Sequence, residues 1–332
     1  MRSLIITEKD AGQRLDKLLG KYLNLAGKSF IYKMLRKKNI TLNGKKCDGS
    51  EKLSCGDEVK LFLAEETIEK FSEVKVQKVR KQELDILYED EHIALINKPS
   101  GMLSQKAKDT DESLVEYFID YLLDKGTIKE EDLKTFRPSV CNRLDRNTSG
   151  IVAAGKSLAG LQMLSGVFKD RSIHKYYQCL VSGAIRDVKT VDGWLLKDEK
   201  KNQVRILTEA EAKRFGGRDG DEEPKRIRTK YEPIATDGKF TLLKVTLLTG
   251  RSHQIRAHLA SLGHPIVGDS KYGGVSKVNP SGRTVKYQLL HSYRLEFPKL
   301  AEPFAYLSGR VVVAPMPGYF CSVLKETGIR LP

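Results

Sequence analysis

The sequence predicts an α+β protein made of a small N-terminal unit and a larger second domain. Apolar residues in the first sixty positions recur at helical spacing and then alternate as in a short sheet. The rest of the 332 residues mixes strand patterns with helix patterns. Because a chain of this length commonly exceeds one hydrophobic core, two domains are expected. We predict residues 1–63 as the first domain, 64–82 as a linker and 83–332 as the second domain.

Two short helices and a small sheet are predicted at the N-terminus. Each helix has one apolar face, and the two are separated at Gly27. The next segment, 40–42, runs into Asn43-Gly44, a strong signal for a hairpin turn. Gly56-Asp57 then precedes a further strand with alternating apolar residues. The positions predicted to point inward are Leu15, Leu18, Leu19, Tyr22, Ile31, Met34, Leu35, Val59, Leu61 and Leu63.

The chain is strongly basic. Its 58 lysines and arginines outnumber 43 aspartates and glutamates, which gives a formal charge of +15. A polyanionic partner is therefore expected. Nucleic acid is the usual one, because neutralising its phosphates releases counterions. The alternative is a basic surface that serves solubility alone.

The cysteines and the N-terminus bear on the compartment. Five cysteines form neither a disulfide framework nor a Cys-x-x-Cys ligand set, which favours a reducing compartment. The N-terminus becomes charged at Glu8 after a short apolar run at 4–6, so no signal peptide or membrane span is predicted. We expect a cytoplasmic protein. The cysteines are Cys47, Cys55, Cys141, Cys179 and Cys321.

The N-terminal unit resembles the alpha-L RNA-binding fold of ribosomal and RNA-modifying proteins. The matching segments are 13–19 (QRLDKLL) and 38–45 (KNITLNGK). In that family the second helix and the hairpin contact structured RNA, and the second helix here is rich in cations. The alternative is a solvated lysine face on a stabilising cap. The cations predicted to bind RNA are Lys28, Lys33, Arg36, Lys37 and Lys38.

Strand patterns open the second domain. Apolar segments at 84–88 and 93–96 are predicted strands, and the second ends at the turn-forming segment 97–101 (NKPSG). Further along, 197–230 is rich in charge and contains several glycines. It is predicted as an exposed, mobile insertion between strands.

Asp145 is the candidate nucleophile. It lies between Arg143 and Arg146 on a turn-forming segment that leads into an apolar strand. Nearby guanidinium groups favour its ionised form, which suits a nucleophile or an anchor and disfavours a proton donor. The alternative is an ion pair that braces a loop.

The segment 150–157 (GIVAAGKS) also fits the phosphate-loop pattern of two glycines four residues apart followed by Lys156 and Ser157. A phosphate loop must follow a buried strand and open a helix. Here the polar residues come first, and 151–154 looks like a strand itself. Ser157 is predicted to cap a helix over 158–168 instead. A nucleotide hydrolase is the less favoured alternative.

Two later segments carry further candidate residues. Tyr177 lies on a predicted strand and shares a face with Cys179. Arg251 follows a strand that ends at Thr249-Gly250 and is placed as a charge partner at the strand-to-helix corner. Two histidines, His253 and His258, lie about 140° apart on a helix, so they do not form a zinc pair.

Four motifs in the second domain together resemble the RluA-type family of pseudouridine synthases over almost its whole length. They are 97–101 (NKPSG), 143–150 (RLDRNTSG), Lys175-x-Tyr177, and 249–259 (TGRSHQIRAHL) with 262–269 and Tyr272-Gly273. The resemblance implies a mixed, mostly antiparallel sheet flanked by helices, with the active site in a cleft across it. It implies isomerisation of uridine to pseudouridine in RNA, by a monomer. We expect large-subunit ribosomal RNA as the substrate, with transfer RNA as the alternative. Since the reaction involves no redox change, no cofactor or metal is implied.

The resemblance also implies roles for individual residues. Asp145 matches the aspartate that attacks the nucleotide, so that uracil detaches, rotates and rejoins the ribose through carbon. Tyr177 packs on the target uracil and takes a proton from its carbon. Arg251 pairs with Asp145, and Arg143 helps to displace the target base.

The match departs from the family in two places. Asn142 stands where a histidine is common, and 102–105 (MLSQ) replaces an apolar run that ends in histidine. Neither departure touches Asp145, so they bear on specificity more than on activity. A second alternative is a non-catalytic RNA-binding or ribosome-assembly factor.

Overall fold

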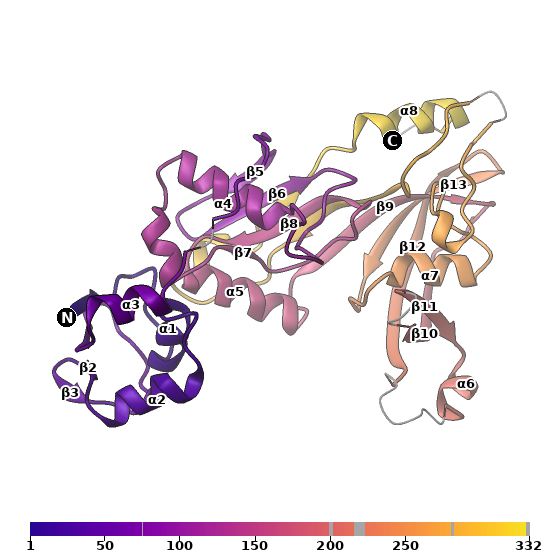
Figure 1. Cartoon of the computed structure of the whole chain (residues 1–332). Coiled ribbons are helices and arrows are strands. Elements are labelled where there is room, and N and C mark those ends of the chain that lie inside the picture. Colours follow the sequence, from indigo (N-terminus) through magenta and orange to yellow (C-terminus); the bar gives the residue numbers. More distant parts are fainter. Residues whose placement is uncertain (75, 199–201, 216–222, 280–281, 330–332) are drawn as a thin grey trace. The chain divides into compact units, whose positions relative to one another are not determined.

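The computed structural model describes all residues except 75, 199–201, 216–222, 280–281 and 330–332. Its contacts divide the chain into two compact units. The first unit comprises Met1–Leu95, Gln105–Asn142 and Ala153–Gly166. The second comprises Ile96–Ser104, Arg143–Val152 and Val167–Pro332. Figure 1 labels the elements of both.

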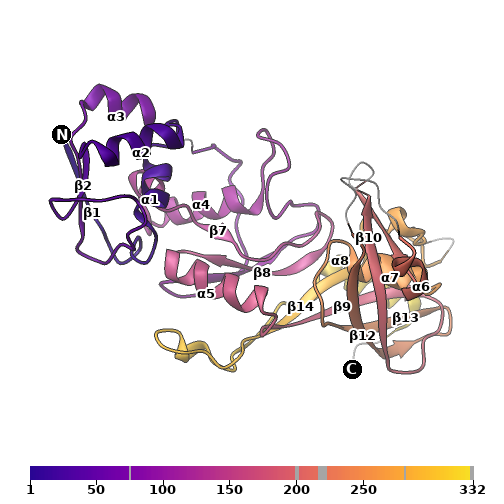
Figure 2. The same ribbon diagram turned by 90° about the horizontal axis from the view of Figure 1, so that it is seen from below.

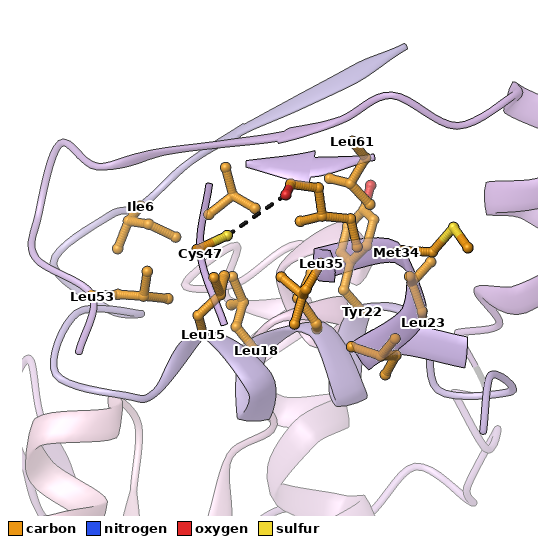
Figure 3. Packing of buried hydrophobic residues seen from close by; sticks show 14 of the residues in the cluster. Ile6, Leu15, Leu18, Tyr22, Leu23, Met34, Leu35, Cys47, Leu53 and Leu61 are labelled. Atoms are coloured by element: carbon orange, nitrogen blue, oxygen red, sulfur yellow. Dashed lines mark hydrogen bonds between the residues drawn. The ribbon is translucent and has the colours of Figure 1, made fainter. Parts of the chain in front are cut away.

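The N-terminal part of the first unit contains a four-stranded sheet in the order β1-β4-β2-β3. Its strands pair antiparallel, and two helices pack on it. Figure 3 shows the core between them, where Leu15, Leu18 and Leu35 are fully buried. Each such leucine contributes about 1.5–3 kcal/mol to stability. The elements are β1 (Arg2–Ile5), α1 (Leu15–Tyr22), α2 (Lys28–Arg36), β2 (Ile40–Leu42), β3 (Lys45–Lys46) and β4 (Glu58–Leu61).

The sequence predictions for this part are confirmed for the helices, the hairpin and the core. Asn43 and Gly44 both have positive φ, 51° and 73°, as a two-residue hairpin turn requires. The segment 64–82, predicted as a linker, contains helix α3 (Glu65–Phe71). Ile68 of this helix is fully buried in the N-terminal core. Because α3 has one buried residue, its sequence shows no apolar periodicity that would predict a helix.

The remainder of the first unit supplies further strands and helices. Strands β6 and β8 each continue from one unit into the other. Here α4 is apolar on most sides and buries Leu114, Phe118 and Leu122 completely. The elements are β5 (Ile86–Glu89), β6 (Ile93–Lys98), α4 (Leu114–Asp124), the 3₁₀ helix η1 (Glu130–Lys134), β7 (Ser139–Val140), β8 (Ser149–Gly155) and α5 (Leu158–Lys169).

The second unit is built mainly from long antiparallel strands. The large sheet has the order β11-β10-β12-β13-β9-β14-β8-β6-β5, with β15 beside β14 and β7 beside β8. Strand β14 runs parallel to β8 and antiparallel to β9, so the sheet is mixed, as expected. Its strands are β9 (His174–Ser182), β10 (Lys189–Asp198), β11 (Gln203–Leu207), β12 (Lys225–Thr236), β13 (Phe240–Leu247), β14 (Leu290–Glu296) and β15 (Val311–Val313).

Helices cover both faces of this part of the sheet (Figures 1 and 2). On one face Ala257 of α7 packs on Ile227 of β12. On the other, Phe320 of α8 packs with Leu180 of β9. Because side chains alternate along a strand, Tyr177 of β9 lies on the face that α7 covers. The remaining helices are α6 (Glu209–Lys213), α7 (Gln254–Ser261), η2 (Ser270–Tyr272), η3 (Ala305–Leu307) and α8 (Gly318–Thr327).

One sequence prediction for this unit needs correction. The segment 197–230, predicted as an insertion, contributes the sheet strand β11, helix α6 and the start of β12, although 199–201 and 216–222 lie outside the described residues. In the described residues, no helix is long and apolar enough to cross a membrane.

Candidate active site

Asp145 lies on a short loop that leads into β8, with its side chain 27% exposed. The loop is tightly turned, since Thr148 N donates to the carbonyl of Asp145 at 3.0 Å. The preceding residue, Leu144, is held by Ser104. The Ser104 hydroxyl donates to the Leu144 carbonyl at 2.9 Å and accepts from the Leu144 N–H at 3.0 Å. Asp145 is thus fixed on both sides while its carboxylate stays accessible.

Lys98 also holds the loop that carries Asp145. Its fully buried ammonium donates to the carbonyls of Met102 at 2.8 Å, Pro99 at 2.9 Å and Arg146 at 3.1 Å. The N–H of Gly101 also donates to the Arg146 carbonyl, at 2.8 Å. Burial lowers the pKa of Lys98 to about 7, and the nearby charge of Asp145 opposes this. The lysine therefore joins the end of β6 to the loop that carries Asp145.

Arg256 of α7 contacts Asp145 directly. Its Nη1 donates to Asp145 Oδ2 at 2.7 Å. The same guanidinium donates through Nε and Nη2 to the two oxygens of buried Asp269, at 2.7 and 2.8 Å, and its Cζ lies 5.1 Å from the Tyr272 ring centroid. Burial alone would lower the pKa of Arg256, but hydrogen bonds and charges from Asp269 and Asp145 raise it above its usual value. Arg256 is a permanent cation in a fixed position.

Tyr177 extends from β9 into the same region. It is 7% exposed and pairs in register with Ser292 of β14 and Val245 of β13. Burial raises the pKa of Tyr177 to about 12, and the charge of Asp145 raises it too, whereas a hydrogen bond with Ser292 lowers it. At neutral pH the hydroxyl is therefore protonated.

His253 approaches Asp145 from a third direction. Its Nε2 lies 3.8 Å from Asp145 Oδ1, and its Nδ1 lies 2.8 Å from the hydroxyl of Tyr272. The side chain is 11% exposed. Asp145 therefore faces two nitrogen groups from one stretch of chain, Arg256 at Oδ2 and His253 at Oδ1.

The sequence profile of the family described as RNA pseudouridylate synthase matches residues 92–261, which include Asp145 and the two side chains that face its carboxylate, His253 and Arg256. This chain belongs to that family. It is an RNA pseudouridine synthase, an enzyme that isomerises uridine within RNA.

Relatives of known name cover most of the chain. Ribosomal large subunit pseudouridine synthase C of Vibrio vulnificus is 32% identical over 277 residues, which are 81% of this chain and 79% of the relative. The protein of the same name from Salmonella typhimurium is 30% identical over 308 residues, 90% of this chain and 88% of the relative. Among solved structures, human RNA Pseudouridylate Synthase Domain Containing 4 has a TM-score of 0.58 at 19% identity. It covers 75% of this chain and 94% of that one, and this likeness supports the fold alone.

The sequence predicts Arg251 as the charge partner of Asp145, but the guanidinium at this carboxylate in the synthase belongs to Arg256. Arg251 is exposed and lies before α7. The chain passes through a left-handed residue at His253, with φ of 54°, before the helix begins. That turn leaves Arg251 on the surface and directs the first turn of α7 inward.

The other predicted arginine is also outside the contact network. Arg143 is exposed, and so is Arg146 on the other side of Asp145. The charges that surround the carboxylate thus come from residues distant in the sequence. A signal for Arg256 was present in Asp269, because a carboxylate in an apolar segment needs a cation, but the sequence does not say which arginine supplies it.

The two departures from the family pattern have structural uses. Asn142 Oδ1 accepts a hydrogen bond from the Ala153 N–H at 2.8 Å and so ties the segment before the active loop to β8. Ser104, in the segment 102–105, supplies the hydroxyl that fixes Leu144. The side chains of Asn142 and Ser104 thus both hydrogen-bond to backbone groups of neighbouring segments.

The phosphate-loop alternative is wrong. Residues 149–155 form the fully buried strand β8, and Ser157 caps α5 by accepting from Gly160 N at 3.1 Å, as predicted. Lys156 donates to Glu89 Oε1 at 2.7 Å and to the carbonyl of Asp90 at 2.6 Å. Although burial opposes it, hydrogen bonds led by that of Lys156 lower the pKa of Glu89 to about 2. This lysine is committed to an internal ion pair.

Proposed function

We propose that this synthase modifies uridine in large-subunit ribosomal RNA. The support is the identity of 30–32% with proteins named ribosomal large subunit pseudouridine synthase C, over 81–90% of this chain. The formal charge of +15 suits a polyanionic substrate. The proposal includes a cytoplasmic monomer, and its five unpaired cysteines suit a reducing compartment.

In this proposal Asp145 is the nucleophile. The observation that carries it is the asymmetric setting of its carboxylate, with Oδ2 held by Arg256 at 2.7 Å and Oδ1 left without a hydrogen bond of that length among the described residues. An ionised, oriented and partly exposed carboxylate is what attack on a nucleotide requires. The bond between N1 of uracil and the ribose breaks, and a bond from C5 to the ribose forms. One proton leaves C5 and one is gained at N1, so the reaction is balanced without a co-reactant.

Arg256 is the positioning residue of this mechanism, because it acts on substrate through Asp145. Tyr177 is proposed to pack against the target uracil. Its pKa of about 12 makes it a weak base at neutral pH, so removal of the C5 proton through Tyr177 would need a partner that takes up the hydroxyl proton. Packing is the better supported role.

RNA binding is proposed for the basic surfaces outside this site. The predicted domains are an N-terminal domain at 1–63, a linker at 64–82 and a catalytic domain at 83–332. Exposed cations on and just after the second helix of the N-terminal domain suit contacts with phosphates. Arg143 and Arg251 are exposed near the catalytic segments and suit contacts with RNA, Arg143 in displacing the target base. The basic residues of α2 and of the two positions that follow it are Lys28, Lys33, Arg36, Lys37 and Lys38.

The test is a carbodiimide primer-extension map of pseudouridine. Unmodified ribosomal RNA transcribed in vitro is incubated with wild-type enzyme or with Asp145→Asn. New stops in large-subunit RNA that require Asp145 are expected. Stops confined to transfer RNA would overturn the substrate class, and stops that persist with Asp145→Asn would overturn the assignment of the nucleophile.

A further inference from the structure

The two oxygens of the Asp145 carboxylate have different surroundings. Oδ2 accepts from Arg256 Nη1 at 2.7 Å. Oδ1 has Nε2 of His253 at 3.8 Å, which is too long for a hydrogen bond. A gap of this size between two polar atoms is wide enough for a third polar atom to contact both.

The protonation of His253 follows from its other neighbour. The hydroxyl of Tyr272 accepts a hydrogen bond from the Val204 N–H at 3.1 Å, so its own hydrogen is free to point to His253 Nδ1 at 2.8 Å. When Nδ1 accepts this hydrogen, a neutral imidazole carries its own hydrogen on Nε2. Burial lowers the pKa of His253, which favours the neutral ring at pH 7, although the charge of Asp145 raises it. A donor therefore faces Oδ1.

The backbone also holds the ring in this place. His253 has φ of 54° and ψ of 14°, the left-handed region, at the residue before α7. A non-glycine residue in this region is strained, so the surrounding structure must hold it there. Tyr272 contributes to both sides of the site, because its hydroxyl orients His253 and its ring lies against Arg256.

We propose that His253 Nε2–H and Asp145 Oδ1 together bind the 2′-hydroxyl of the target ribose, with His253 donating to the hydroxyl oxygen and the hydroxyl donating to Asp145. This inference rests on the proposed role of Asp145 as the nucleophile. A hydroxyl oxygen about 2.8 Å from each atom would close the gap between them. His253 is then a residue that selects ribose and positions its reacting edge.

The chemistry of an RNA chain singles out this hydroxyl. The 3′- and 5′-oxygens of an internal nucleotide are esterified, so the 2′-hydroxyl is the only group on its ribose that can both donate and accept. It is also carried by the carbon next to the one whose bond to uracil breaks and re-forms in the proposed mechanism. Holding it against Oδ1 brings that carbon to the carboxylate before bond making.

The test compares two amide variants that differ by one methylene. His253→Gln keeps a donor at a reach comparable to Nε2, whereas His253→Asn tolerates the left-handed backbone but is too short to reach the ribose. Each is assayed with an RNA stem-loop that carries the uridine mapped with wild-type enzyme. A second stem-loop has 2′-deoxyuridine at that position. For the uridine stem-loop, the enzyme concentration that gives half the maximal single-turnover rate is measured. For the 2′-deoxyuridine stem-loop, the inhibition constant is measured.

Wild type is expected to prefer the ribose form about tenfold, the worth of one to two hydrogen bonds. His253→Gln should keep most of this preference. His253→Asn should lose it by weakening the ribose form while leaving the inhibition constant of the deoxy form unchanged. Tyr272→Phe, which keeps the ring beside Arg256, should give an intermediate loss.

The inhibition constant of the deoxy form serves as the control for folding. Equal weakening of both RNAs in His253→Asn would indicate a structural role and overturn the proposal, as would an unchanged preference. The stem-loop is taken from whichever cellular RNA the wild-type map identifies. A site in transfer RNA would therefore overturn the proposed substrate class without touching this test.

Discussion

The cations of α2 and those around Asp145 are used in opposite ways. Lys33 and Arg36 of α2 point to solvent on an exposed helix face. Arg256 is buried and shared between two carboxylates, and Lys98 is enclosed by three carbonyls. Exposed, mobile cations suit a polyanion whose phosphates vary in position, whereas a reacting carboxylate needs charges that do not move. The first kind should control RNA affinity and the second the rate of chemistry.

The largest expected effect is that of Asp145→Asn. Removal of the proposed nucleophile should lower the single-turnover rate by about 10⁴-fold or more, with RNA affinity changed by less than about threefold. Pseudouridine formed from a radiolabelled transcript measures the rate, and filter binding measures the affinity. Asp187→Asn, at an exposed position, is the matched control and should leave both unchanged. Normal activity in Asp145→Asn would make another residue the nucleophile.

Replacing each candidate arginine by lysine distinguishes Arg256 from Arg251. Lysine cannot hold Asp269 and Asp145 at once, so Arg256→Lys should lower the rate at saturating RNA by about 100-fold. Arg251→Lys should change it by less than about threefold. The comparison is a single-turnover rate at saturating enzyme. A larger loss for Arg251→Lys would restore the pairing expected from the sequence.

Alanine at three exposed lysines on and just after α2 tests whether these cations control RNA affinity. Replacing Lys33, Lys37 and Lys38 should weaken RNA binding and reduce the slope of log affinity against log salt by roughly 0.7–0.9 for each phosphate that is no longer neutralised. Chemistry at saturating RNA should survive. Binding is measured between about 50 and 200 mM salt.

A charge-matched control uses three exposed lysines elsewhere in the chain, and this variant should keep the wild-type salt slope. A large loss of the single-turnover rate in the helix variant would mean that the N-terminal unit helps to build the active site. The control replaces Lys239, Lys277 and Lys299.

Lys98 should make the stability of the folded protein depend on pH. Its pKa is about 7 in the folded protein and 10.5 in the absence of burial. Below pH 7 both states are protonated and the cost of the buried charge is fully present. Between pH 7 and 10.5 the unfolded state holds more protons, so the free energy of unfolding rises with pH, by at most about 1.4 kcal/mol per unit.

Lys98→Met removes this titration and retains the apolar stem. The difference in unfolding free energy between wild type and Lys98→Met, from urea denaturation at pH 7 to 9.5, should therefore grow in favour of wild type. A difference that stays flat over this range would mean that the three carbonyls and Asp145 keep the ammonium charged without cost.

The sequence by itself determined the local elements and indicated Asp145 as the candidate nucleophile. Helical spacing identified α1 and α2 with their inward residues, and Asn43-Gly44 identified the hairpin, because these signals depend on neighbours within a few positions. The motif around Asp145 indicated the family. Helix α3 was missed because Ile68 is its only buried residue.

Only the tertiary structure decided which side chains meet at Asp145. Arg256, His253 and Lys98 come from segments far from it in the chain, and they are brought together by the sheet and by the left-handed turn before α7. Arg251 and Arg256 look equivalent in the sequence. They differ in the structure because the electrostatic energy of a charge depends on its distance from Asp145 and on its burial, and both are set by packing between distant elements.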